Sequence, residues 1–323
     1  MYDPAEQPLL LEARHVRTWF PIRRGMLSRV TGHVRAVDDV SFDIRRGETL
    51  ALVGESGCGK TTIGRTLLGL ETAREGNVLF EGANLLGLSV AAWRPFRRRL
   101  QMIFQDPLSS LNPRMTVLDI LTEGPAHHGL LHGPREELAE RLLGEVGMDT
   151  SSLHRYPHEF SGGQRQRICI ARALSLNPEF IVCDEAVSAL DVSVQSQIIN
   201  LLLDLREKHH LSYLFISHDL GVVRLISHRV AVMYLGRIVE TGNTRSVIET
   251  PRHPYTRALV SAVPVPGRDR ARRIILHGEV PSPARPPPGC PFHPRCPEAM
   301  DVCRREVPTA RTVDGITVQC HLY

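Results

Sequence analysis

Residues 54–62 read Gly54-Glu55-Ser56-Gly57-Cys58-Gly59-Lys60-Thr61-Thr62, and this stretch decides the fold. It has the spacing G-x-x-x-x-G-K-[ST], in which glycines let backbone N–H groups turn toward a phosphate chain. The apolar run Thr49–Val53 before it predicts a buried strand, and residues 62–70 predict a helix with one apolar face. Such a helix directs its positive end at the loop. This context favours a nucleotide phosphate site over a glycine-rich turn that binds nothing.

Composition is that of an ordinary globular protein. The chain has 323 residues, of which 42 % are hydrophobic and 23 % charged, and its net charge of +4 is too small to indicate nucleic-acid binding. No apolar run approaches the ~20 residues of a membrane-spanning helix. Residues 1–6 lack the pattern of a secretion signal, so we expect seven reduced or metal-bound cysteines and a cytosolic setting.

Periodicity predicts an α/β organisation with a helical insertion. Short strands are predicted at 9–20 and 33–44, separated by a basic loop that contains Arg23, Arg24 and Arg29, and at 76–80 and 100–104. Helical spacing dominates residues 116–153. Strand and helix patterns then alternate at 180–183, 192–209, 213–216, 220–226 and 230–234, which is typical of a parallel sheet with helical crossovers.

Two acids end one of these predicted strands. Phe180-Ile181-Val182-Cys183 is followed directly by Asp184 and Glu185. Ligands of α/β proteins bind at the carboxyl ends of the strands. Asp184 is therefore a candidate Mg²⁺ ligand and Glu185 a candidate for polarising an attacking water, whereas an ordinary acidic turn is the alternative.

A second predicted helix start has the features of an anion site. Ser161-Gly162-Gly163-Gln164 precedes two arginines and an apolar helix predicted over residues 168–176. Ser161 is a suitable N-cap, and the two glycines permit close approach of an anion to the backbone. A simple helix cap would not require so specific a sequence.

Taken in their order along the chain, the motifs within residues 8–262 resemble those of the nucleotide-binding subunits of ATP-binding-cassette (ABC) transporters. The glycine-rich loop at 54–62 resembles Walker A, and Asp184-Glu185 resembles the end of Walker B. Residues 161–164 resemble the signature sequence. The remaining matches are Gln105 with the Q-loop glutamine, Ser188-Ala189-Leu190-Asp191 with the D-loop, and His218 with the switch histidine.

The resemblance implies residue roles. ATP would bind between Walker A of one subunit and the signature helix of another, with Glu185, His218 and Gln105 in catalysis. Mg²⁺ would be held by Thr61, Gln105 and Asp184, and Phe20 would stack on adenine. The implied ATP contacts are Phe20, Gly54, Ser56, Gly57, Cys58, Gly59, Lys60, Thr61, Thr62, Ser161, Gly162, Gly163, Gln164 and Asp191.

Further motifs resemble the oligopeptide/dipeptide importer branch of this family, and within it the second, F-type ATPase subunit. They are Phe104-Gln105-Asp106-Pro107, Leu111-Asn112-Pro113-Arg114, Tyr156-Pro157-His158-Glu159 and His253-Pro254-Tyr255-Thr256. One departure is Ala186, where the branch usually has proline. The implied fold is a P-loop NTPase (ABC ATPase) core over 8–262, with an antiparallel β subdomain and a helical subdomain at about 107–175.

Residues 263–323 form a predicted C-terminal extension with a proline-rich connector at 281–288. It contains Cys290, Cys296, Cys303 and Cys320, spaced C-x5-C-x6-C-x16-C. Four thiolates in one short segment suit a [4Fe–4S] cluster or Zn²⁺. Some peptide-importer ATPases carry such a cluster in a similar extension. We expect a cluster first, zinc second, and unliganded cysteines third.

The resemblance implies an ATPase that energises import of di- or oligopeptides at the cytoplasmic face of the cell membrane. Its implied partners are a second, D-type cassette, two permease subunits and, through them, an extracytoplasmic peptide-binding protein, but no nucleic acid. Import of another solute, such as nickel or a glutathione-like peptide, is the alternative. A DNA-repair or translation ABC ATPase is disfavoured by the short interval between Gln105 and Ser161 and by the single Walker A motif.

Overall fold

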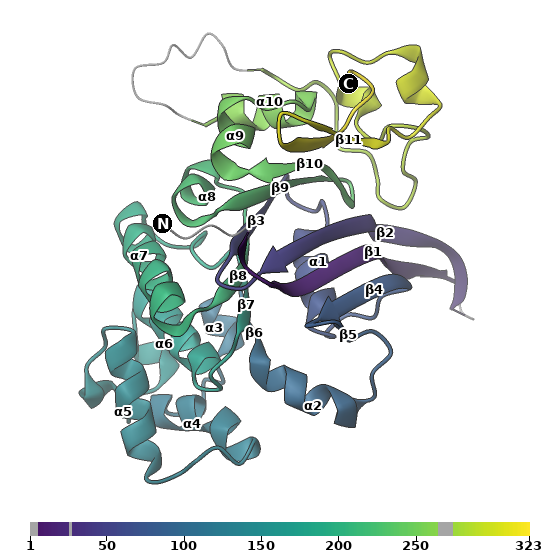
Figure 1. Cartoon of the computed structure of the whole chain (residues 1–323). Coiled ribbons are helices and arrows are strands. Elements are labelled where there is room, and N and C mark those ends of the chain that lie inside the picture. The colour runs from purple at the N-terminus through teal and green to yellow at the C-terminus, as the bar shows by residue number, and fades with distance from the viewer. Residues whose placement is uncertain (1–5, 26–27, 264–273) are drawn as a thin grey trace. The chain divides into compact units, whose positions relative to one another are not determined.

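The structure is a computed structural model that describes residues 6–25, 28–263 and 274–323 (Figure 1). Its contacts define two units. One comprises Arg46–Glu48 and Leu88–Ile216, together with residues 6–7, and the other comprises Pro8–Arg45, Thr49–Gly87 and Ser217–Tyr323. Each unit is described separately below.

The second unit contains the expected antiparallel sheet, with strand order β2-β1-β4-β5. Its strands are β1 (Leu9–Arg24), β2 (Arg29–Arg45), β4 (Glu75–Phe80) and β5 (Ala83–Asn84). The prediction of a basic loop was wrong, because the strands pair out to Arg24 and Arg29. The hydrogen-bonded pairing of β1 and β2 continues past the residues whose alternating hydrophobicity predicts a strand. Arg23, Arg24 and Arg29 therefore lie within the strands.

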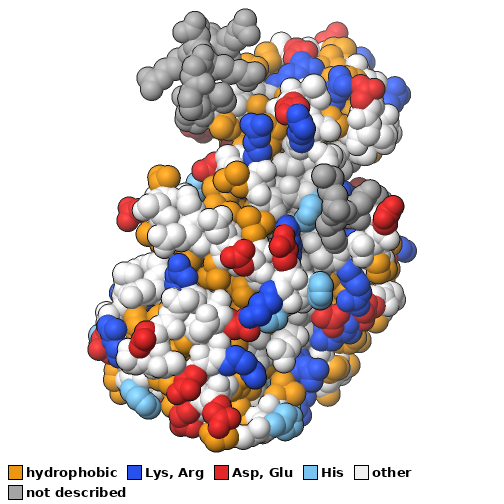
Figure 2. All heavy atoms as spheres, turned by 60° about the vertical axis from the view of Figure 1, so that its left-hand side comes forward, with side chains coloured by type: hydrophobic (Ala, Val, Ile, Leu, Met, Phe, Trp, Pro, Cys, Tyr) orange, Lys and Arg blue, Asp and Glu red, His pale blue; other side chains and the backbone are white. Residues whose placement is uncertain are grey.

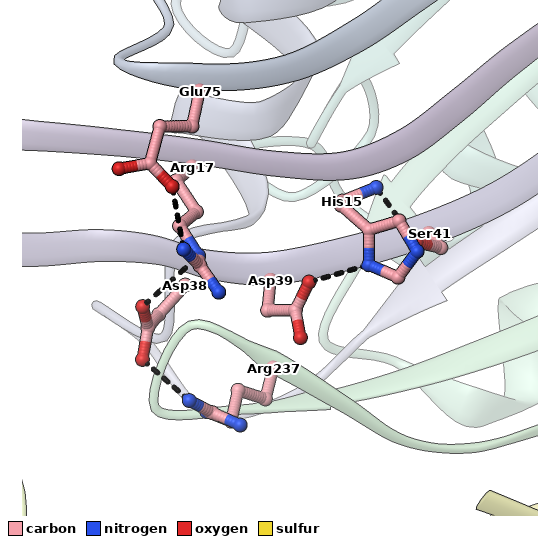
Figure 3. A network of polar contacts seen from close by, with 7 residues as sticks. All are labelled: His15, Arg17, Asp38, Asp39, Ser41, Glu75 and Arg237. Carbon is pink, nitrogen blue, oxygen red and sulfur yellow. Dashed lines mark hydrogen bonds and ion pairs between the residues drawn. The ribbon is translucent and has the colours of Figure 1, made fainter.

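A network of charged side chains connects this sheet to Arg237, at the start of a neighbouring strand (Figure 3). Arg17 of β1 forms an ion pair with Glu75 of β4 and lies 4.0 Å from a carboxylate oxygen of Asp38 on β2. Asp38, only 6 % exposed, also accepts a 2.8 Å hydrogen bond from Arg237. Arg237 begins β10 (Arg237–Asn243), so one buried carboxylate connects three strands.

The glycine-rich loop follows a strand of a mixed sheet in the same unit. Within this unit the order is β11-β12-β10-β9-β3, and β3 (Thr49–Val53) runs parallel to β9 (Arg229–Tyr234). All five residues of β3 are buried, as the apolar run predicts. The helices of this unit are α1 (Lys60–Leu67), α8 (Leu220–Ile226), α9 (Thr244–Glu249) and α10 (Pro254–Ser261).

The first unit consists of three parallel strands and most of the helices. The strands are β6 (Leu100–Ile103), β7 (Phe180–Asp184) and β8 (Ser212–Ser217), paired in the order β8-β7-β6. Its helices are α2 (Val90–Arg99), α3 (Pro107–Ser110), α4 (Val117–His127), α5 (Arg135–Glu145), α6 (Gly162–Leu174) and α7 (Val192–His209), with short 3₁₀ turns at Thr150–Ser152 and Pro157–Glu159. The predicted helical insertion and the helix over 192–209 are confirmed.

The C-terminal extension shares a hydrophobic core with the strands beside the glycine-rich loop. Phe292 is 1 % exposed, and its ring centre lies 5.2 Å from that of Tyr234 and 5.4 Å from that of Tyr255. Strand β12 (Ile316–Gln319) pairs with β10 and with β11 (Ala310–Val313), which extends the mixed sheet. The division into 8–262 and 263–323 stays a prediction, and the structure adds that both segments contribute to one core.

Within the described residues, no helix is both long and apolar enough to cross a membrane. On the face shown in Figure 2, Lys and Arg side chains are interspersed with Asp and Glu. The face in view therefore has no continuous surface of one charge.

Replacing Phe292 by alanine tests the shared core. The substitution removes a buried ring that packs against both Tyr234 and Tyr255, so we expect Phe292→Ala to lower the free energy of unfolding by about 3–5 kcal/mol. Urea denaturation followed by circular dichroism measures the loss. Leu225→Ala, at a residue that is 68 % exposed, is the control and should change it by less than about 0.5 kcal/mol. Equal effects of the two substitutions would contradict the shared core.

Candidate nucleotide-binding site

The glycine-rich loop is shaped by close contact with two carbonyl groups. Gly54 and Gly59 both have positive φ angles, 155° and 105°. A Cβ atom on Gly54 would lie 2.2 Å from the carbonyl oxygen of Met233 on β9, and one on Gly59 would lie 2.0 Å from that of Ala36 on β2. Only glycine fits at either position, so the motif's glycines are explained by backbone packing as well as by access to phosphate.

Hydrogen bonds hold the same loop to the β9–β10 turn. The N–H of Gly236 donates to the carbonyl oxygen of Cys58 at 2.9 Å, and the carbonyl oxygen of Gly236 accepts from the N–H of Asp38 at 2.8 Å. Cys58 itself is 3 % exposed, and burial raises the pKa of its thiol. We therefore interpret Cys58 as a packing residue, whose carbonyl holds the β9–β10 turn and whose sulfur lies 3.8 Å from the Lys60 ammonium.

Lys60 lies inside the loop, as the motif requires. Its ammonium donates to the carbonyl oxygens of Gly54, at 2.8 Å, and Glu55, at 3.0 Å, and only 5 % of the residue is exposed. These acceptors are backbone carbonyls of the loop itself, and the ammonium also contacts the Cys58 sulfur at 3.8 Å, so the loop fixes the side chain where the motif expects a phosphate. Thr61 and Thr62 continue into the first turn of α1, and Ser56 and Gly57 lie in the turn before it.

Two side chains that the sequence analysis missed hold Glu55 of this loop. Its backbone N–H donates to the hydroxyl oxygen of Tyr255 at 2.8 Å. Its carboxylate accepts two hydrogen bonds from the guanidinium of Arg295, at 2.7 and 3.1 Å. The His253-Pro254-Tyr255 motif was a signal for the first contact, because His253 caps α10 by accepting from the Tyr255 N–H at 3.1 Å.

His218 borders a hollow beside the same loop. The hollow has a volume of about 380 Å³ and is lined by Val53, Gly54, Glu55, His218, Asp219, Leu220, Leu259, Ala262 and Val263. Asp219 caps α8 by accepting hydrogen bonds from two backbone N–H groups, at 2.7 and 3.3 Å. The structure thus brings the predicted switch histidine and the start of the predicted phosphate loop to one hollow.

The two acids at the end of β7 have different surroundings. Asp184 is 2 % exposed. Glu185 has a left-handed backbone, with φ of 46°, and its carboxylate accepts a 2.8 Å hydrogen bond from the side-chain amide of Gln105. The structure therefore brings together Gln105 and Glu185, which the sequence placed in two separate motifs.

The predicted signature segment is a well-formed helix start. Ser161 caps α6 by accepting from the Gln164 N–H at 3.3 Å, and Gln164 in turn accepts from the Ser161 N–H at 3.0 Å. The helix begins at Gly162, six residues before the predicted start, because this reciprocal cap satisfies its first N–H groups. A Cβ on Gly163 would lie 2.6 Å from Val194 of α7, so the glycine allows the two helices to approach.

The remaining predicted ATP contacts are exposed. Phe20 lies on β1 and is 37 % exposed, whereas the ring of its neighbour Trp19 already contacts the guanidinium groups of Arg35 and Arg74, at 4.8 and 4.5 Å from the ring centre. Phe20, not Trp19, is thus the aromatic available for stacking. Asp191 is exposed at the start of α7.

The four cysteines of the C-terminal extension influence one another. Cys290 and Cys303 are each 7 % exposed, and Cys296 and Cys320 are partly buried. Burial, followed by the charges of the three other thiols, raises the pKa of Cys290 to about 11. In the described residues, no three His, Cys, Asp or Glu side chains are grouped so as to hold a single metal ion.

Comparison with protein families finds two regions. The family model described as "ABC transporter" matches residues 37–188, and the model described as "Oligopeptide/dipeptide transporter, C-terminal region" matches residues 239–303. The first region contains the glycine-rich loop, Gln105, the signature segment and the acidic pair. The second contains Tyr255 and Arg295, the two residues that hold Glu55.

Comparison with individual proteins also finds ATP-binding proteins of transporters. The chain is 52 % identical to the oligopeptide transport ATP-binding protein AppF of Bacillus subtilis, over 99 % of each chain. It is 56 % identical to the glutathione import ATP-binding protein GsiA of Salmonella paratyphi A, over 84 % of this chain and 44 % of that protein. Among solved structures, a dimeric ATP-binding cassette bound to ADP and phosphate after hydrolysis gives a TM-score of 0.64 at 25 % identity, over 73 % of this chain and 99 % of that one.

Alanine substitutions at two loop glycines separate backbone strain from crowding. Gly57 and Gly59 both have positive φ, but a Cβ on Gly57 would meet nothing within 4 Å. We expect Gly57→Ala to cost about 1–2 kcal/mol of stability, the usual penalty of left-handed backbone. Gly59→Ala should cost more, because the Ala36 carbonyl must move. Thermal unfolding of both variants without nucleotide compares them, and equal losses would show that the loop is not packed as described.

Proposed function

Because this chain belongs to the ATP-binding subunits of oligopeptide-type ABC transporters, we propose that it hydrolyses ATP to energise import of di- or oligopeptides across the cytoplasmic membrane. The observation that carries the proposal is the joining, in one chain, of a complete set of cassette motifs to the C-terminal region of peptide transporters. The likeness to AppF over 99 % of both chains supports it.

The proposed chemistry is phosphoryl transfer to water. Lys60 neutralises the β- and γ-phosphates, and Glu185 polarises the attacking water. The 2.8 Å hydrogen bond from Gln105 orients the Glu185 carboxylate, and His218 contacts the γ-phosphate side of the site. The signature segment at 161–164 and Asp191 complete the site of a second cassette.

Mg²⁺ accompanies ATP as part of the substrate. The donor set suits it, because hydroxyl, amide and carboxylate oxygens are the ligands that Mg²⁺ prefers. We assign them to Thr61, Gln105 and Asp184. Asp184 is 2 % exposed, and a buried carboxylate is strongly favoured when a cation neutralises it. Phe20 stacks on adenine in this assignment.

The proposed working unit is a pair of cassettes docked on two permease subunits. The second cassette is a D-type paralogue, and an extracytoplasmic peptide-binding protein delivers the solute through the permeases. The chain would then lie at the cytoplasmic face of the membrane as a peripheral subunit. Import of glutathione-like peptides is a second candidate, favoured by the 56 % identity to GsiA. Nickel is a third candidate solute, and finding nickel permeases encoded beside this chain would favour it.

For the C-terminal extension we propose a [4Fe–4S] cluster held by Cys290, Cys296, Cys303 and Cys320. The four thiols interact electrostatically, yet the described side chains include no grouping for one ion. A [4Fe–4S] cluster would take four cysteine thiolates, the number that this extension supplies. The positive iron atoms would also offset the burial that raises the pKa of Cys290.

Glu185→Gln tests the catalytic assignment. The amide keeps the shape of the side chain but does not polarise water, so we expect unchanged ATP binding and turnover reduced about 10²–10⁴-fold. Lys60→Ala should instead weaken ATP binding, because it removes a ground-state phosphate contact. Phosphate release and fluorescent-nucleotide binding, measured with the reconstituted transporter, distinguish the two. Glu207→Gln on the exposed face of α7 is the matched control, and near-normal turnover of Glu185→Gln would exclude Glu185 as the catalytic base.

Metal analysis tests the cluster. Protein purified without oxygen should be brown and contain roughly four irons and four labile sulfides per chain. Cys303→Ser should lose the colour and the iron, whereas Cys169→Ser, at a buried cysteine of α6, should retain both. Stoichiometric zinc in a colourless protein would refute the cluster, and four titrating thiols without metal would refute both metal sites.

A further inference from the structure

An acidic side chain lies in the loop that receives the phosphates, and it is paired. Glu55 is the second residue of the glycine-rich loop, and its side chain is 29 % exposed. Both of its carboxylate oxygens accept hydrogen bonds from Arg295, whose side chain is only 8 % exposed. A bidentate pair of this kind fixes geometry as well as charge.

The C-terminal extension fixes the position of Arg295. The residue ends a short 3₁₀ turn (His293–Arg295), and its N–H donates to the Phe292 carbonyl at 3.0 Å. Phe292 is buried against Tyr234 and Tyr255, and the guanidinium of Arg295 lies 5.9 Å from the centre of the Tyr234 ring. The guanidinium therefore depends on the folded extension for its position.

Cysteines of the extension flank this arginine. Cys296 follows it directly, and the N–H of Cys290 donates to the Cys303 carbonyl at 2.8 Å. Gly289 has φ of 68°, and a Cβ there would lie 2.4 Å from the same carbonyl oxygen. The segment that leads to Arg295 is thus held against the backbone of Cys303.

The pairing of Glu55 with Arg295 changes the charge that the loop presents to a nucleotide. An unpaired carboxylate beside the phosphates of ATP would repel them, and partial burial limits screening by salt. The hydrogen bonds to Glu55 raise the pKa of Arg295 above its usual value, which is the signature of a favourable pair. Tyr255 holds the backbone of the same residue through the Glu55 N–H, at 2.8 Å.

We propose that Arg295 is a positioning residue for the phosphate loop: it neutralises Glu55 and holds it in place, so that the folded C-terminal extension sets the affinity of the cassette for ATP. The inference rests on the proposed function, in that the loop binds ATP. It goes further in assigning a role in ATP binding to Arg295, which lies outside the cassette motifs.

A double-mutant cycle on the full chain tests this proposal. Binding of a fluorescent ATP analogue with Mg²⁺ is measured for wild type, Arg295→Met, Glu55→Gln and the double variant. We expect Arg295→Met to weaken binding by about tenfold, within the range typical of two coupled sites. Glu55→Gln should bind about as well as wild type, and the double variant should recover most of the loss, because the carboxylate that Arg295 neutralises is gone.

A purely structural role predicts a different pattern. In that case the double variant binds as weakly as Arg295→Met, and the proposal is overturned. Arg257→Met is the matched control, because it breaks contacts between α10 and the extension, a 2.8 Å ion pair with Glu298 and a 3.0 Å hydrogen bond to the Tyr323 hydroxyl, and removes no hydrogen bond of Glu55. It should leave ATP affinity unchanged. An equal loss in Arg257→Met would also overturn the proposal, since any damage to the extension would then suffice.

Two further variants keep the outcome interpretable. Thermal unfolding without nucleotide checks that each variant folds, and if Arg295→Met does not, Arg295→Gln makes the same comparison with a polar side chain. Lys60→Ala separates this inference from the proposed function. If Lys60→Ala binds ATP like wild type, the proposed phosphate site itself is wrong. If it loses binding while Arg295→Met and Arg295→Gln retain it, only the role of Arg295 falls.

Discussion

The structure around the candidate site depends on the contact of two glycines with two backbone carbonyl groups. Gly54 lies against Met233 on β9, and Gly59 lies against Ala36 on β2. Because neither position tolerates a Cβ, the loop, the parallel strand pair and the antiparallel sheet adopt one mutual arrangement. The β9–β10 turn completes it through Gly236, and the Asp38 carboxylate then joins this turn to β1 and β2. The position of Lys60 follows from this packing.

A second layer of contacts comes from chain segments far from the motif. Tyr255 holds the backbone of Glu55 and Arg295 holds its side chain, and both side chains depend on the aromatic core around Phe292. A loop made of glycines has little intrinsic order, so contacts from outside contribute to its shape. The C-terminal extension is therefore part of the environment of the candidate nucleotide site, although its cysteines suggested a separate module in the sequence.

Sequence predicted most of the elements and the residue types of the site, because both follow local rules. Apolar runs identified β3 and β7, and the G-x-x-x-x-G-K-[ST] spacing identified the loop. Sequence did not predict the pairing of Glu55 with Arg295, since this contact depends on how distant segments pack. It also did not predict α2, whose single buried residue, Trp93, gives no periodic signal. The residue roles assigned from motifs stay predictions.

The burial of the cysteines has a practical chemical consequence. Cys58, Cys169, Cys183, Cys290 and Cys303 are buried, and Cys296 and Cys320 are partly exposed. Burial raises the pKa of Cys183 so far that its thiolate is negligible at neutral pH. Alkylating reagents and oxidants should consequently reach Cys296 and Cys320 first in the metal-free chain. Because Cys296 adjoins Arg295, a reagent attached there would report on the surroundings of the glycine-rich loop without any engineered label.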